Sequence, residues 1–157
     1  NKGKILNCYA TGDVHSYSVF GGFVGVNKGN IYYCYATGSL EKITGYDVSY
    51  TAGRFVGSNE GQINNAYATG NVTSEYTGAG FVSSNSGIIL NAYATGKVSG
   101  KVEPAGFVGT NRKNIENVFF AGKTVASGAE LYGAGCKSTC SVFVPESNTA
   151  TMTFLPV

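Results

Sequence analysis

Catalytic and metal sites are most often built from histidine, carboxylate and cysteine side chains, and this chain has few of them. It contains one histidine, nine Asp and Glu residues together and four cysteines. His15 lies two positions from Asp13, so in a strand both side chains would share a face. Catalysis by a nucleophile also requires an oriented base, and no Gly-x-Ser-x-Gly motif is present. We expect a solvated loop pair here and no enzymatic activity.

The acidic and cysteine residues also lack the spacing of metal sites. The carboxylates do not recur with the sequence repeat described below, whereas the calcium-binding β-rolls carry aspartates in every coil. The cysteines do not form the paired C-x-x-C motifs of zinc sites. We therefore expect neither a metal ion nor another cofactor.

Two local pairs of cysteines raise the question of disulfides. Cys136 and Cys140 are close enough to bridge across a short loop, and we predict that bridge if the protein is exported. Cys8 and Cys34 occupy the same position of successive repeats. If they stack, their Cα atoms would be about 5 Å apart, within the disulfide range. A bridge and two small buried thiols are equally consistent with that spacing.

Length and composition narrow the class of protein. A chain of 157 residues suits one domain. Charged residues make up 13%, against about 25% in typical proteins, and the net charge is only +2. These values argue against disorder and against nucleic-acid binding. No apolar run is long enough for a membrane span. The 23 glycines and 11 tyrosines are typical of repeated β-structure.

A repeat of 26 residues organises the sequence. The phrase Asn-Lys-Gly-Lys-Ile-Leu-Asn-Cys-Tyr-Ala-Thr-Gly opens the chain and recurs three times, with a weaker fifth copy. One interval is longer by six residues, which lie within residues 39–54 and have the polar, glycine-bearing composition of a loop. The copies occupy residues 1–12, 27–38, 59–70, 85–96 and 111–122.

This period predicts an all-β fold, a parallel β-solenoid of about five coils. Helical repeats are longer and show apolar residues at three- and four-residue spacing, and propeller blades need about 40 residues. Stacked coils would align each position of the repeat into a ladder. We expect the solenoid over residues 1–125 and a capping segment over 126–157, where the register fails. The expected core columns are Ile5, Ile31, Ile63, Ile89 and Ile115; Phe23, Phe55, Phe81 and Phe107; and the small residues Cys8, Cys34, Ala66, Ala92 and Val118. Turn asparagines would form an amide ladder at Asn27, Asn59, Asn85 and Asn111.

The candidate binding surface is a strip of tyrosines and threonines. If Cys8 and Ala10 point inward, strand alternation sends Tyr9 and Thr11 outward, unless Asn7 marks a bend. Aromatic faces can stack on sugars while hydroxyls set orientation. Stacked tyrosines also stabilise a solenoid without any ligand, and evenly spaced threonines occur in ice-binding solenoids. The strip comprises Tyr9, Tyr35, Tyr67, Tyr93, Thr11, Thr37, Thr69 and Thr95.

The phrase Gly-Phe-Val-Gly-x-Asn-x-Gly-x-Ile-x-x-Cys-Tyr-Ala-Thr-Gly at Gly22 to Gly38 resembles the GLUG motif. GLUG repeats occur in bacterial secreted and surface proteins, including adhesins and some immunoglobulin-A peptidases. The resemblance extends over about residues 1–125, with phenylalanine where the family more often has leucine. It implies an extracellular repeat architecture and supplies no catalytic residues.

These observations favour a non-catalytic structural or adhesive segment of a secreted or surface-attached bacterial protein. The expected partners are host or environmental glycans or proteins, and coil ends suggest end-to-end self-association. The alternatives are a carbohydrate-binding or ice-binding module and an accessory repeat region of a larger secreted peptidase.

Overall fold

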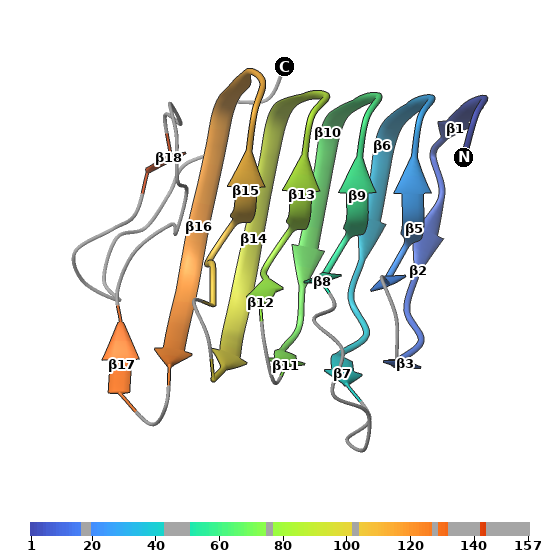
Figure 1. The fold of residues 1–157 in the computed structure, drawn as a ribbon. Coiled ribbons are helices and arrows are strands. Elements are labelled where there is room, and N and C mark those ends of the chain that lie inside the picture. The colour runs from blue at the N-terminus through green and yellow to red at the C-terminus, as the bar shows by residue number, and fades with distance from the viewer. Residues whose placement is uncertain are drawn as a thin grey trace.

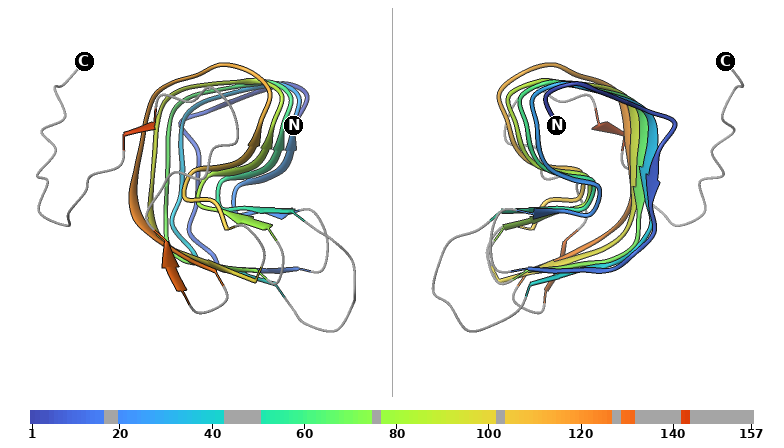
Figure 2. Two further views of the ribbon diagram at one scale, coloured as in Figure 1. Left: turned by 60° about the vertical axis from the view of Figure 1, so that its left-hand side comes forward. Right: turned by 90° about the vertical axis from the view of Figure 1, so that its right-hand side faces the viewer.

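The chain folds as an all-β parallel β-solenoid with a repeat of about 26 residues (Figure 1). The computed structural model describes residues 1–16, 20–42, 51–74, 77–101, 104–126, 129–131 and 142–143. Over these residues the solenoid completes about four turns, against the about five coils expected. Seen along its axis, the coil outline has two lobes joined at a narrow waist (Figure 2).

The largest sheet runs along the outer wall and contains the longest strands. Within each coil the chain follows this wall through both lobes, as a single strand in the last coils and as shorter strands in the earlier ones. Its strands are β1 (Lys4–Leu6), β2 (Tyr9–Ala10), β3 (Val14–Ser16), β6 (Asn30–Ala36), β7 (Leu40–Lys42), β10 (Gln62–Thr69), β11 (Val72–Ser74), β14 (Ile88–Gly100), β16 (Ile115–Ala126), β17 (Ala129–Leu131) and β18 (Val142–Phe143).

Two smaller sheets close each coil. In each coil the chain leaves the outer wall, and a strand of the first small sheet brings it back to the waist. A strand of the second small sheet then leads from the waist toward the outer wall of the next coil. The first contains β4 (Phe20–Gly21), β8 (Thr51–Gly53) and β12 (Thr77–Ala79). The second contains β5 (Val24–Asn27), β9 (Val56–Asn59), β13 (Val82–Asn85) and β15 (Val108–Asn111).

The strand register confirms the repeat assigned from sequence. Ile31 pairs with Ile5 on one side and with Ile63 on the other, and the column continues through Ile89 and Ile115. Leu40 of β7 pairs with Val72 of β11, and β8 pairs with β12. The six additional residues therefore fall between β7 and β8, and the register resumes after them.

Ladders of identical side chains fill the interior of one of the two lobes. The phenylalanine column is stacked, with ring centroids 4.8–4.9 Å apart. Beside it, the buried asparagine amides donate from coil to coil: Asn27 Nδ2 lies 2.8 Å from Asn59 Oδ1, and the next two steps are 2.7 Å. Both ladders were predicted. Each buried amide is paired, so it avoids the free-energy cost of an unsatisfied polar group.

A bend with positive φ shifts the alternation of side chains along the outer wall. In β10 the residues Asn64 and Asn65 are both only half-buried, between the buried Ile63 and Ala66. Asn65 has a φ of 52°, in the left-handed region, so two successive side chains avoid the core. The same conformation recurs at Asn7 (52°), Tyr33 (53°), Asn91 (49°) and Asn117 (51°).

A second apolar cluster occupies the other lobe, and a buried arginine lies beside it. The cluster contains Leu40, Val72 and Val98. Arg54 is 0% exposed, and its three guanidinium nitrogens have no hydrogen-bond partner. It stands in the position that glycine holds in the other coils, Gly22 being one of them. Burial lowers the pKa of the Arg54 guanidinium, and the Asp13 carboxylate opposes that shift.

Two strands from the last part of the chain lie against the final coil. β17 pairs with β16 in antiparallel orientation, and β18 pairs with it in parallel, with Val142 opposite Val118. Cys136, Cys140 and most of the predicted capping segment lie outside the described residues.

Candidate binding surface

The tyrosine and threonine columns lie on the outer face of the largest sheet, as predicted. After the positive-φ bend, the strand alternates between the buried Cys34 and Ala36 and the half-buried Tyr35 and Thr37. The same alternation of buried and half-buried side chains recurs in the next two coils, where the half-buried residues are Tyr67, Thr69, Tyr93 and Thr95. In the first coil Thr11 and Tyr9 are exposed, Tyr9 to 64%. Asn7 does mark a bend, but the bend lies before the strip and leaves its outward orientation intact.

The tyrosine rings stack on one another. Ring centroids are 5.2 Å apart between Tyr9 and Tyr35, 4.8 Å between Tyr35 and Tyr67, and 4.9 Å between Tyr67 and Tyr93. The planes of neighbouring rings differ by no more than 8°. Each internal ring is therefore covered on both faces, and it presents its edge and hydroxyl to solvent. The candidate site was based in part on sugars stacking on the ring faces. The ladder covers those faces at the internal rings, so sugars cannot stack there.

Two hydroxyls of the ladder ionise less readily than that of an ordinary tyrosine. Burial raises the pKa of Tyr67 and of Tyr93, and in each case a neighbouring tyrosine raises it further. A phenolate in the stack would lose hydration and would repel a second one beside it. A tyrosine hydroxyl can both donate and accept hydrogen bonds, so the strip offers a row of such groups to a partner.

The thiols of Cys8 and Cys34 are free, so the possible bridge between them is not formed. The Sγ atom of Cys34 lies 3.4 Å from the backbone nitrogen of Cys8 and 3.1 Å from the carbonyl of Tyr32. Cys34 is buried, and burial raises the pKa of its thiol. Cys8 was expected to point into the core, but it is exposed.

The histidine pairs across coils and not with its neighbour in sequence. His15 Nδ1 lies 3.6 Å from a carboxylate oxygen of Glu41, and both side chains are more than half exposed. Asp13 instead accepts a hydrogen bond from the backbone nitrogen of Ser39. Among the described residues, no group of three or more His, Cys, Asp or Glu side chains is arranged to hold a metal ion.

Comparison with known families identifies the repeat. The family model described as the GLUG motif matches residues 16–44. The chain carries a GLUG motif. No curated protein and no solved structure matches it. The matched segment begins at the last residue of β3 and includes β4, β5, β6 and β7. It therefore corresponds to one coil.

The GLUG phrase contains a glycine, Gly29, at which successive coils approach closely. A Cβ atom on Gly29 would lie 2.0 Å from the carbonyl oxygen of Gly3 in the preceding coil. Gly61 and Gly87 stand in the same relation to the glycines before them, also at 2.0 Å. A side chain at Gly29, Gly61 or Gly87 would therefore clash with the coil before it, whereas the last copy of the repeat has Lys113 at this position.

The surface around this glycine column was not among the predicted sites. It forms a groove lined by Lys2, Lys4, Lys28 and Lys113. The sequence does contain a signal for this groove, because lysine lies next to the glycine in the first two coils. Those lysines were interpreted only as part of the repeat. Within the described part of the chain, no helix has the length and apolar character of a membrane span.

Proposed function

We propose that the chain is a non-catalytic, adhesive β-solenoid segment of a secreted or surface-attached bacterial protein. Its task is to hold a repetitive surface in a fixed geometry toward host or environmental glycans or proteins. The GLUG motif and the solenoid fold support the structural part of this proposal. The adhesive part rests on the tyrosine ladder with its neighbouring threonines.

The ladder is the observation that carries the proposal. Its rings are held on a regular wall at intervals of 4.8–5.2 Å, so their hydroxyls are ordered before any partner arrives. Such preorganisation reduces the entropy lost on binding. Because the internal ring faces are covered, recognition proceeds through hydroxyl hydrogen bonds along the strip, together with the exposed ring of Tyr9.

A glycan array tests this surface. The full chain is compared with a variant carrying Tyr35→Phe, Tyr67→Phe and Tyr93→Phe, which removes the hydroxyls and retains the rings. We expect at least one glycan to bind the parent chain and to bind the variant roughly tenfold more weakly, as several hydrogen bonds are lost.

A second variant with Thr73→Val serves as the control, because Thr73 is exposed on the same wall but lies outside the strip. It should bind like the parent. Absence of binding by the parent chain, or equal binding by the phenylalanine variant, would leave a stiff spacer as the function of this segment.

A further inference from the structure

A basic groove runs along one corner of the solenoid, on a surface that shares no residue with the tyrosine and threonine strip. Its volume is about 690 Å³, and its floor is the glycine column Gly3, Gly29, Gly61 and Gly87. Because successive coils are about 4.8 Å apart, the four glycines of the floor span roughly 14 Å. The groove therefore has the shape needed for an extended chain lying parallel to the solenoid axis.

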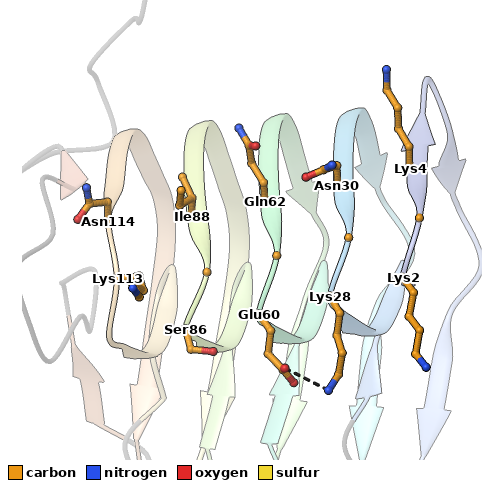
Figure 3. A pocket seen from close by; sticks show the side chains of 14 residues that line it. Lys2, Lys4, Lys28, Asn30, Glu60, Gln62, Ser86, Ile88, Lys113 and Asn114 are labelled. Carbon is orange, nitrogen blue, oxygen red and sulfur yellow. Dashed lines mark ion pairs between the residues drawn. The ribbon is translucent and has the colours of Figure 1, made fainter.

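Two rows of side chains form the rims (Figure 3). Lys2, Lys28, Glu60 and Ser86 point to one side of the glycine floor. The opposite rim is lined by Lys4, Asn30, Gln62, Ile88 and Asn114. The rim cations therefore lie in the first two coils, and most of the remaining rim side chains can form hydrogen bonds.

The charge of the groove is positive. Four of its lining residues are lysines, and its one carboxylate, Glu60, is engaged by Lys28 at 3.1 Å. Lys4 lies 5.5 Å from the centre of the Tyr32 ring, which holds this ammonium group at the rim. An occupant that carries several negative charges would complement these cations.

The backbone of the floor is already paired, and this argues against a peptide occupant. The amide of Asn30 donates to Gly3 at 2.9 Å, that of Gln62 to Gly29 at 2.9 Å, and that of Ile88 to Gly61 at 2.9 Å. An extended peptide gains much of its affinity by adding a strand to free backbone groups, which these inter-coil hydrogen bonds have used. Single-stranded nucleic acid needs aromatic platforms for its bases, and no aromatic residue lines the groove.

We infer that the groove binds an acidic polysaccharide, with lysines contacting its carboxylates and amide or hydroxyl side chains contacting its neutral hydroxyls. Both kinds of group are present on the two rims, and a polyuronate chain carries both kinds of partner. This inference goes beyond the adhesive role proposed for the tyrosine ladder, and either can fail without the other.

The test uses fluorescently labelled oligogalacturonate and its fully methyl-esterified form, in which each carboxylate is replaced by a neutral methyl ester. We expect the full chain to bind the acid and not the ester, with affinity that falls as salt is added. Polyglutamate of similar length is the third probe. It carries the charge without the hydroxyls, and we expect it to bind more weakly.

Three single substitutions locate the binding site. Lys28→Gln removes a cation and leaves Glu60 unpaired, so we expect binding to weaken roughly fivefold, whereas Glu60→Gln should strengthen it roughly threefold. Lys97→Gln changes the net charge by the same amount as Lys28→Gln, but Lys97 is exposed outside the groove and its loss should leave binding unchanged.

The inference would be overturned if the acid failed to bind, if the ester or polyglutamate bound as tightly as the acid, or if Lys97→Gln weakened binding as much as Lys28→Gln. The phenylalanine variant of the tyrosine ladder keeps every groove residue. Its binding of oligogalacturonate should equal that of the parent, which separates this site from the strip.

Discussion

Tyr33 has a backbone conformation that asparagine adopts in the other coils. Its φ of 53° matches those of Asn7, Asn65, Asn91 and Asn117, which lie between 49° and 52°. Asparagine enters the left-handed region more readily than bulky residues do, because its short polar side chain hydrogen-bonds locally. The Tyr33 side chain is 60% exposed, so little buried surface offsets its backbone strain.

Replacing this residue should therefore stabilise the protein. We expect Tyr33→Asn to raise the free energy of unfolding by about 1 kcal/mol, measured by urea denaturation. Tyr32→Asn is the matched control. Tyr32 lacks positive φ, and its hydroxyl donates to Gln62 at 3.2 Å, so this change should lower the stability. A destabilised Tyr33→Asn variant would show that the tyrosine ring contributes more than its conformation costs.

Arg54 is the second residue that departs from the repeat. A buried guanidinium without hydrogen bonds costs several kcal/mol relative to the same group in water. We expect Arg54→Met, which keeps a long side chain but removes the charge, to raise the free energy of unfolding by about 1–3 kcal/mol. Differential scanning calorimetry should show a higher Tm. A lower Tm would mean that the charge is compensated in the folded protein.

At the scale of the element, stacking and burial change the ionisation of two tyrosines of the ladder. The pKa values of Tyr67 and Tyr93 are raised above the ordinary 10.0 by burial and then by the adjacent tyrosine. Between the ordinary and the raised value, the folded chain retains protons that the unfolded chain releases. The free energy of unfolding should consequently fall as the pH rises from about 10.

This alkaline loss of stability is measurable by urea denaturation at about pH 8.5 and about pH 10.5. The double variant Tyr67→Phe and Tyr93→Phe should lose less stability over that interval, because it lacks the two phenols. All other ionisable groups are common to both proteins, so the difference in stability loss isolates the contribution of Tyr67 and Tyr93. Identical slopes would argue against raised pKa values in the folded state.

The ladders were predictable from sequence, whereas the surfaces they create were only partly so. A strict period aligns equivalent residues, which is why the isoleucine, phenylalanine and asparagine columns were assigned correctly. The shift in side-chain alternation at Asn65 depends on a positive φ angle that asparagine permits but does not require. The covered ring faces follow from the near-parallel stacking, and the groove follows from the corner at Gly29. Neither geometry can be deduced from residue type alone.

At the scale of the whole molecule, coils are interchangeable units that contact chiefly their neighbours. Removing residues 71–96 deletes one period and joins Gly70 to Lys97, so every remaining column keeps its register. We expect this shortened chain to fold with the same circular dichroism spectrum. Its denaturant m-value should fall by roughly a quarter, because one of about four turns is gone.

Deletion of residues 71–83 provides the control. It removes half a period and places Ser84 after Gly70, so the columns no longer align. This variant should be unfolded or aggregated. If both deletions folded equally well, stacking in register would not be what stabilises the solenoid.

The stacking of equivalent residues also has a genetic consequence. Exchange between two copies of the repeat within the gene, when it joins equivalent positions, adds or removes whole coils and leaves the interior unchanged. Ile31 pairs with the equivalent isoleucines Ile5 and Ile63, and a coil inserted beside it would offer the same partner. The length of the segment, and with it the reach of the surfaces it carries, can therefore change in a single step without any new core having to evolve.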